Sequence, residues 1–314
     1  MADVRNKLNR LVHLPGRLSA ATGQIERLLK AGETNGLLLG KILSNEVKAL
    51  GSRQFLKDTE FRVYSQWGDD GIIQYLIRNV PLQSESFIEF GVEDYGEANT
   101  RFLLVNDNWR GLIIDGSRDF MDRVRTSDMY WRHDLTAVDA FITRDNINEI
   151  ISANGFSGTL GILSIDIDGN DYWVWEAINV VDPAIVIVEY NSVFGSKRAI
   201  TVPYDKDFRR ANAHSSYLFW GCSLRALCLL SEKKGYVFVG CNSNGNNAYF
   251  VKRSLAENLQ PVSVEEGYVL SRFRESRDPD GQLSYLSGDR RFAEIRNMMV
   301  VDVEKNATVR LGDS

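Results

Sequence analysis

The chain has 314 residues, of which 44% are hydrophobic and 25% are charged, and its formal net charge is −5. These values are ordinary for a globular protein of one large domain or two, and the acidic balance argues against a general nucleic-acid binder. The three cysteines form neither a CxxC pair nor a disulfide framework, so we expect a reducing compartment. The sequence shows no apolar run of the roughly 18 residues that span a membrane and no signal-peptide core, which predicts a cytoplasmic protein.

The charge is distributed unevenly along the chain. Residues 1–57 contain ten basic and four acidic side chains, a formal charge of +6, which leaves −11 for the remainder. Short apolar faces predict helices in this segment, interrupted at Gly32 and Gly36. We expect residues 1–57 to form a helical arm that packs on the body or mediates homo-oligomer formation. Its basic residues leave open a peripheral contact with the inner face of a membrane or with an anionic glycan.

Residues 58–260 alternate short apolar runs with amphipathic helical segments. The apolar runs predict strands at residues 86–91, 111–115, 129–133, 161–167, 184–188, 236–241 and 248–251. Repeated strand–helix units require a parallel sheet, and the turn-rich connection between the last two strands makes the final strand antiparallel. The predicted fold class is therefore α/β, with a mostly parallel seven-stranded sheet that ends in a hairpin. Residues 261–314 form a polar C-terminal extension and a candidate for substrate contacts.

Acidic residues stand at or just after the predicted ends of the strands, the edge where open α/β sheets bind ligands. They are Glu89, Asp115, Asp134, Asp166, Asp168 and Glu189. Asp115 at the end of the second strand is suited to accept both hydroxyls of a ribose. NAD-binding folds share this feature, but the chain lacks their Gly-x-Gly-x-x-Gly motif.

Residues 87–96 read Phe-Ile-Glu-Phe-Gly-Val-Glu-Asp-Tyr-Gly and resemble motif I of the class I S-adenosylmethionine-dependent methyltransferases. Glu89 and Gly91 match the acid-x-Gly-x-Gly-x-Gly form, whereas Glu93 stands where a glycine is common and Gly96 comes late. The resemblance implies a Rossmann-like methyltransferase fold with S-adenosylmethionine as cofactor. It further implies that Asp134 meets the adenine amino group. The predicted cofactor-binding residues are Gln66, Glu89, Gly91, Asn99, Asp115, Gly116, Ser117, Asp134 and Asp166.

Two further stretches, Ser-Ile-Asp-Ile-Asp-Gly at 164–169 and Ile-Val-Glu-Tyr-Asn at 187–191, are similar to those of FkbM-type and macrocin-type O-methyltransferases. The resemblance covers about residues 64–252. Because members act mostly on sugar hydroxyls or natural products, it implies O-methylation of a sugar, and we expect one in a cell-surface polysaccharide or lipopolysaccharide. It also places metal-binding acids at 187–191.

A sugar hydroxyl is a poor nucleophile, so it needs a base or a metal to remove its proton. Asp168, Glu189 and Asn191 offer hard oxygen ligands for Mg²⁺ or another divalent cation. We predict His214 and Asp168 as catalytic residues; the alternatives are that His214 lies in a surface loop and that Asp168 caps a helix. The loop 192–213 is a candidate substrate lid. The tail arginines, a candidate phosphate or uronate clamp, are Arg272, Arg274, Arg277, Arg290 and Arg291.

Two other functions remain open from the sequence. Asp166-Ile-Asp168 is formally the Asp-x-Asp motif with which glycosyltransferases bind a metal and a nucleotide sugar. A catalytically silent methyltransferase fold that acts as a binding or scaffold protein is the second alternative.

Overall fold

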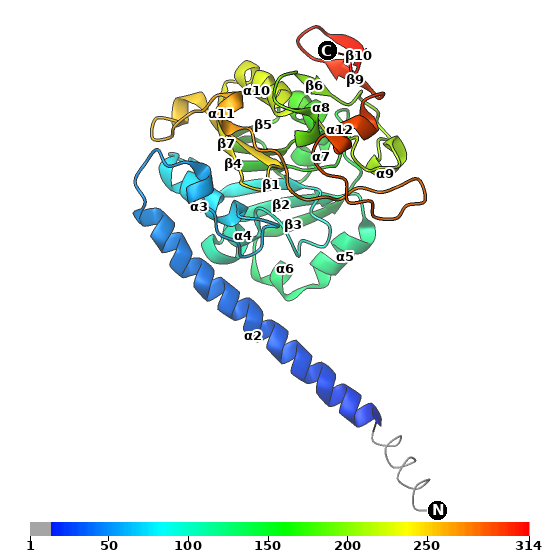
Figure 1. Cartoon of the computed structure of the whole chain (residues 1–314). Coiled ribbons are helices and arrows are strands. Elements are labelled where there is room, and N and C mark those ends of the chain that lie inside the picture. The colour runs from blue at the N-terminus through cyan, green and yellow to red at the C-terminus, as the bar shows by residue number, and fades with distance from the viewer. Residues whose placement is uncertain (1–13, 314) are drawn as a thin grey trace, which may run out of the picture.

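The computed structural model describes residues 14–313, and its centre is a seven-stranded sheet in the order β3-β2-β1-β4-β5-β8-β7 (Figure 1). Strands β1 to β5 pair in parallel, and β8 runs antiparallel to both of its neighbours. The strands are β1 (Ser86–Phe90), β2 (Arg110–Asp115), β3 (Leu135–Asp139), β4 (Gly158–Ile165), β5 (Val181–Glu189), β7 (Tyr236–Cys241) and β8 (Asn247–Lys252). This confirms the predicted α/β fold class, with a mostly parallel seven-stranded sheet that ends in an antiparallel hairpin. The strand order reverses between β1 and β4.

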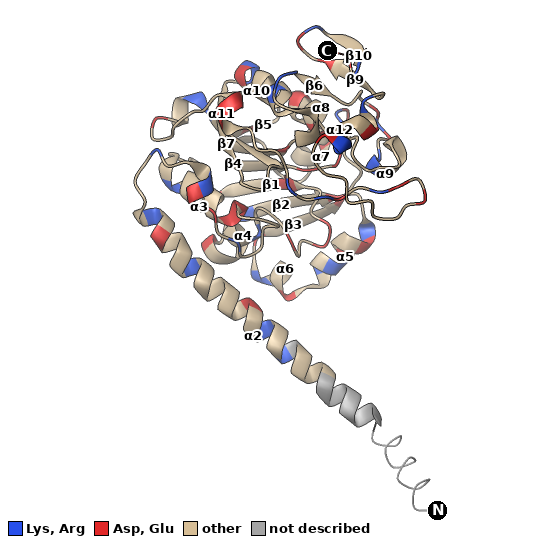
Figure 2. Cartoon of the chain, in the orientation of Figure 1, with Lys and Arg blue, Asp and Glu red and all other residues tan. Residues whose placement is uncertain are grey.

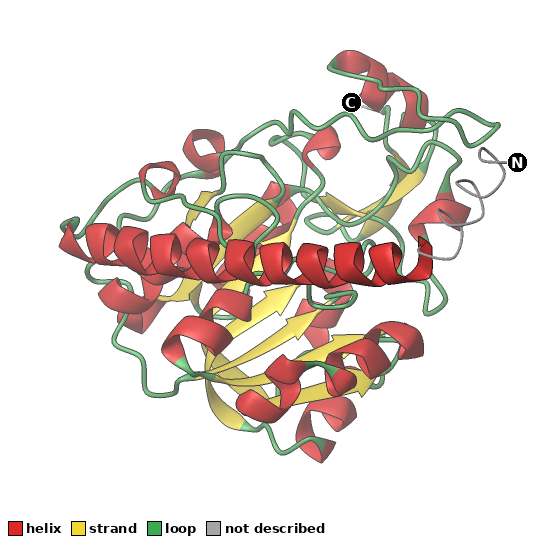
Figure 3. Ribbon diagram, turned by 90° about the horizontal axis from the view of Figure 1, so that it is seen from below, coloured by secondary structure: helices red, strands yellow, loops and turns green. Residues whose placement is uncertain are grey.

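Helices cover both faces of the sheet, which Figure 3 shows from below. Successive strand residues point to opposite faces, so Phe87 and Ile113 belong to one core while Ile88 and Leu112 belong to the other. The first core is completed by α3 (Asp69–Asn79), α4 (Arg101–Asp107) and α5 (Arg118–Thr126). The second is completed by α7 (Ile147–Ala153), α8 (Asp171–Ala177) and α10 (Leu224–Lys233).

The predicted third strand at 129–133 is wrong. The segment forms a short helix, α6 (Asp128–Arg132), and the strand lies later, at β3. The bulky side chains of this segment pack from a helix, with Met129 and Tyr130 against the first core and Trp131 71% exposed. In β3, Leu135 and Ala137 alternate into the core instead. The shift matters for the site because it moves the carboxyl end of this strand from residue 133 to Asp139.

A second, three-stranded sheet joins two distant parts of the chain. Strand β6 (Ile200–Thr201) pairs with β9 (Met299–Asp302), which pairs with β10 (Ala307–Arg310). A third apolar core lies with it, including Phe194, Leu218 and Ile295. The loop 192–213 and the C-terminal extension therefore fold together. Their other helices are α9 (Arg210–Ala213), α11 (Val264–Gly267) and α12 (Asp289–Ile295), and short 3₁₀ turns lie at Leu56–Asp58, Ser192–Phe194 and Arg253–Leu255.

The N-terminal arm is a single helix, α2 (Leu14–Ala49), that extends from the body (Figure 1). The predicted interruption at Gly32 and Gly36 is wrong, since the helix continues through both. Each glycine costs about 1 kcal/mol relative to alanine, which a helix of 36 residues tolerates. Residues 1–13 of the predicted arm lie outside the described residues. Within residues 14–313, no helix is both long and apolar enough to cross a membrane.

Candidate functional site

A cavity of about 520 Å³ opens at the carboxyl ends of β1, β4 and β5. This is the point where the strand order reverses and where open α/β sheets bind ligands. Its volume lies within the range of small-molecule sites. The lining is strongly acidic, with a single arginine. The charged lining residues are Glu89, Glu93, Glu97, Asp166, Asp168, Glu189, Glu275 and Arg210.

Glu89 of β1 organises one wall of the cavity. Its carboxylate accepts the backbone N–H groups of Asn99 at 2.8 Å and Thr100 at 3.0 Å, together with the Thr100 hydroxyl at 2.5 Å. Burial raises the pKa of Glu89 to about 7. Glu89 therefore fixes the turn that starts α4 and holds Asn99 at the cavity, where its side-chain amide donates to Ser164 at 3.1 Å.

Gly91 occupies a position that only glycine fits. Its φ is +70°, and a Cβ there would lie 1.7 Å from the carbonyl oxygen of Asp166. The backbones that follow β1 and β4 thus touch at Gly91. The next loop accommodates Glu93 in the left-handed region, at φ 48°, with its N–H donating to Asp115 at 2.9 Å. A glutamate here adopts the conformation for which a glycine is the usual residue.

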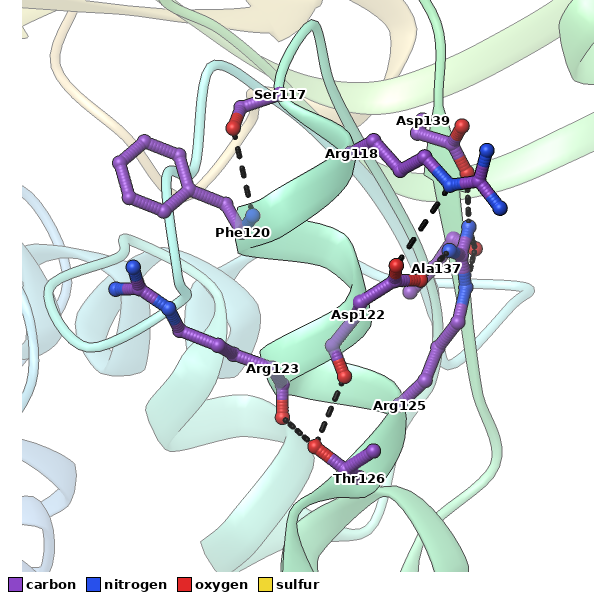
Figure 4. Close-up of polar contacts among 9 residues, drawn as sticks. All are labelled: Ser117, Arg118, Phe120, Asp122, Arg123, Arg125, Thr126, Ala137 and Asp139. Carbon is purple, nitrogen blue, oxygen red and sulfur yellow. Dashed lines mark hydrogen bonds and ion pairs between the residues drawn. The ribbon is translucent and has the colours of Figure 1, made fainter.

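Asp115, Gly116 and Ser117 follow β2, beside the Glu93 loop. One Asp115 oxygen accepts from Glu93, and the other accepts the Ser117 N–H at 2.8 Å. Ser117 caps α5 by accepting the Phe120 N–H (Figure 4). None of the three lines the cavity itself, whereas Gln66 lies at its edge and is exposed. Asp115 keeps acceptor capacity, because each oxygen uses one of its lone pairs.

Asp134 is not a site residue. It precedes β3 and therefore lies at the opposite edge of the sheet, where its exposed carboxylate pairs with Arg110 at 3.8 Å. The acid at the carboxyl end of β3 is Asp139, in register with Asp115. Figure 4 shows Arg125 of α5 bonded to Asp139 at 2.6 Å and to the carbonyl of Ala137 at 2.8 Å. This ion pair lowers the pKa of Asp139.

Among the acids that line the cavity, Asp166 and Glu189 have the most strongly raised pKa values. They follow or end the neighbouring strands β4 and β5, and their carboxyl groups hydrogen-bond one another. Burial, and then the neighbouring negative charges, raise both pKa values well above their ordinary range. Because two adjacent carboxylates resist ionising together, the pair holds a proton to higher pH than either carboxyl group would alone. One oxygen of Glu189, Oε2, is buried without a hydrogen-bond partner among the described residues.

Replacing Asp166 with asparagine is expected to flatten the pH dependence of stability. In the unfolded chain both acids ionise near pH 4, whereas in the folded protein the pair ionises at much higher pH. The wild-type free energy of unfolding should therefore fall as pH rises through this interval. Asp166→Asn leaves only one ionisable carboxyl group in the pair. The free energy of unfolding of the variant, measured by urea denaturation, should therefore increase relative to that of the wild type from pH 5 to pH 8. An unchanged difference across that range would contradict the shared proton.

Asp168 lies at the cavity mouth, at φ 54°. It pairs with Arg210 at 3.0 Å, and Arg210 also binds Glu275 at 3.1 Å and the carbonyl of Tyr217 at 2.7 Å. Arg210 thus ties the β4 turn to the C-terminal extension. Asp168 does not cap α8, whose N-cap residue is Asn170 and has no side-chain cap bond. The turn before the helix is held instead by Asp171, whose carboxylate accepts the N–H groups of Ile167 and Gly169.

The predicted metal ligands do not converge. Asn191 is buried, its Nδ2 donates to the carbonyls of Leu218 and Trp220, and its Oδ1 accepts the N–H of Val193. The carboxylate of Asp168 already forms an ion pair with the guanidinium group of Arg210. Within the described part of the chain, no three His, Cys, Asp or Glu side chains form a group suited to a metal. The donor set therefore does not fit Mg²⁺, and the assignment of Asn191 as a ligand is wrong. The Asp-x-Asp interpretation is weakened too, because Asp166 pairs with Glu189 instead.

His214 does not reach the cavity lining. It follows α9, and its Nδ1 is engaged by the hydroxyl of Ser216 at 2.8 Å and by the Ser216 N–H at 3.2 Å. The tail arginines also do not converge on one clamp. Arg291 is buried and donates to the carbonyls of Ser271 and Phe273, which positions the segment that carries Glu275.

Several lining residues were missed by sequence reasoning. Phe273 and Glu275 come from the extension, and Trp220 follows the loop that contains Arg210. Asn246 ends the β7–β8 turn, and Asn247 begins β8. The asparagine-rich turn was visible only as a hairpin signal. The two extension residues carried no local signal at all.

A scan against protein-family models and a search of curated proteins found no match. Among solved structures, the chain is similar to the N-terminal domain of EvdMO1 with SAH bound, at 9% identity over 60% of this chain and 80% of that chain, with a TM-score of 0.39. A S-adenosylmethionine-dependent methyltransferase from Clostridium acetobutylicum matches at 10% identity over 58% and 89%, with a TM-score of 0.38. The O-methyltransferase from Bacillus cereus in complex with SAH matches at 13% identity over 72% and 90%, with a TM-score of 0.35.

Proposed function

We propose that the chain is an S-adenosylmethionine-dependent O-methyltransferase that acts on a neutral sugar hydroxyl. The observation that carries the proposal is the acid-lined cavity at the strand-order reversal, in which Oε2 of Glu189 has no hydrogen-bond partner among the described residues. S-adenosylmethionine carries two positive groups, a sulfonium and an ammonium, and one carboxylate. Seven acids and one arginine around the cavity favour a ligand with this excess of positive charge.

The cofactor-binding residues in this proposal are Gly91, Asn99, Asp115 and Asp166. Gly91 lets a ligand approach the backbone closely, Asn99 offers a side-chain amide, and Asp115 has acceptor capacity for a ribose. When bound, S-adenosylmethionine supplies a methyl group on a positively charged sulfur. Glu189 accepts the proton of the attacking hydroxyl, as the bond from oxygen to the methyl carbon forms and the bond from that carbon to sulfur breaks.

The negative charges that line the cavity also favour an acceptor that is itself uncharged. A phosphate or uronate next to the reacting hydroxyl would face Asp168, Glu189 and Glu275, with only Arg210 to offset them. A neutral sugar hydroxyl, as in a polysaccharide or the glycan of a lipopolysaccharide, meets no such repulsion. Transfer of a labelled methyl group to matched neutral and uronate glycans tests this: the neutral series should be labelled, and a preference for the uronates would contradict it.

Methyl transfer is expected to survive metal removal. Asn191 is occupied by backbone groups and Asp168 by Arg210, so these residues offer no set of free oxygens to a cation. Turnover measured in excess EDTA should remain within about two-fold of the untreated value, with Mg²⁺ addition as the control. Loss of activity in EDTA that Mg²⁺ restores would show that other residues bind an essential metal.

A further inference from the structure

Helix α2 has two distinct long faces. One packs on the body: Glu33 pairs with Arg101 at 2.9 Å, Ser44 donates to Gln74 at 2.7 Å, and Val47 lies in the first core. The other face carries seven large apolar side chains that are 36–68% exposed. They are Ile25, Leu28, Leu29, Leu38, Leu39, Ile42 and Leu43. We call these seven residues the α2 seam.

The α2 seam follows a coiled-coil pattern. With Ile25 at heptad position a, all seven residues fall at positions a, d, e and g, which are those that face a partner helix. The body-facing Glu33, Ser44 and Val47 fall at b and f instead. From residue 24 to residue 45 no charged residue occupies a, d, e or g. The seven seam side chains are thus exposed on a helix that extends from the body (Figure 1).

The seam is also self-complementary when its direction is reversed. If a second α2 lies antiparallel, with the twofold axis between Glu33 and Thr34, Ile25 meets Ile42 and Leu28 meets Leu39. At the centre the small Gly32 meets Asn35. Each a position thus faces a d position of the partner, and side chains of equal size meet in the outer layers. A surface that matches itself in this way is what a twofold-symmetric dimer requires.

We propose that two copies of this chain associate through antiparallel pairing of their α2 helices. The seven seam residues expose on the order of 800 Å² per chain, which equals one side of a standard specific interface. A membrane surface explains the pattern less well. The charged residues of the described helix are of both signs, as Figure 2 shows, and include Glu33 and Glu46 beside Lys30 and Lys41.

Light scattering and sedimentation of the full chain test the proposal. The wild type should be a dimer at micromolar concentration, whereas Leu28→Lys and Leu39→Glu alone should each give monomers. Both substitutions in one chain should restore the dimer, because the two opposite charges face each other in the antiparallel register. Lys41→Glu, outside the seam, is the matched control and should leave the dimer intact. Circular dichroism checks the fold, which these exposed positions should not alter.

Spin labels at Lys48→Cys test the direction of pairing. In the antiparallel register the two labels should lie about 43 Å apart along the axis, whereas parallel helices would hold them within about 20 Å. A short distance would overturn the proposed register. A monomeric wild type at about 100 μM would overturn the proposal itself, as would binding of α2 to anionic vesicles with no dimer in solution.

Discussion

Replacing Glu189 with glutamine is expected to lower kcat about 100-fold or more while the affinity for S-adenosylhomocysteine stays within a few-fold of wild type. Glutamine keeps the size of the side chain and its hydrogen bond with Asp166, but it cannot accept a proton. Glu189 is the acid of the central pair whose second oxygen has no partner among the described residues. Single-turnover methyl transfer and calorimetry measure the two quantities separately.

Asp166→Asn and His214→Ala are the matched controls for this effect. An asparagine amide at 166 donates to Glu189 and removes a negative neighbour, so the pKa of Glu189 should fall and the acidic limb of the pH–rate profile should move to lower pH. His214→Ala should change turnover only a few-fold, because His214 does not line the cavity. A Glu189→Gln enzyme with near wild-type kcat, or a His214→Ala enzyme without activity, would remove Glu189 from the role of base.

Replacing Gly91 with alanine is expected to lower the free energy of unfolding by about 3 kcal/mol or more. The added Cβ would lie 1.7 Å from the carbonyl oxygen of Asp166, in a backbone conformation that alanine rarely adopts. The carboxyl ends of β1 and β4 would have to separate, which also opens the cavity.

Gly116→Ala provides the comparison for Gly91. A Cβ at Gly116 meets only the Phe141 ring at 3.5 Å, so its effect should stay below about 1 kcal/mol. Urea denaturation of both variants measures the difference. Equal losses for the two variants would mean that the contact between Gly91 and Asp166 does not hold the two strands together.

The sheet could be predicted because short local patterns in the sequence mark its strands. The apolar runs at 86–91 and 111–115 are short and bounded by Gly or Asp, and the structure places β1 and β2 there. The acids Glu89, Asp166 and Glu189 lie at the sheet edge that topology predicts. Since the carboxyl ends of parallel strands meet at one edge, local signals sufficed to bring these three together.

Asp134 shows how a small local error changes a site. Met129, Tyr130 and Trp131 suggest a strand by composition, yet side-chain packing favours a helical turn there. The strand begins only at Leu135, and its last residue is Asp139. An error of a few residues in one strand thus moved an expected cofactor residue to the wrong edge of the sheet.

The remaining misses depend on contacts between distant segments. Arg210 reaches Glu275, and β6 pairs with β9, across long stretches of chain. No periodicity or spacing encodes such pairs. Asn191 illustrates the converse case. Its sequence position suggests a ligand, but the carbonyls of Leu218 and Trp220 occupy its amide only because the chain returns there.

Calorimetric titration of the full chain with S-adenosylhomocysteine tests the central claim most directly, which is that the acid-lined cavity binds this cofactor. We predict one site per chain with a micromolar Kd, weakened at least ten-fold by Gly91→Ala in a folded sample and little changed by Lys41→Glu. Absence of binding by both S-adenosylhomocysteine and S-adenosylmethionine, with binding of a nucleotide sugar and Mg²⁺ in their place, would contradict the account.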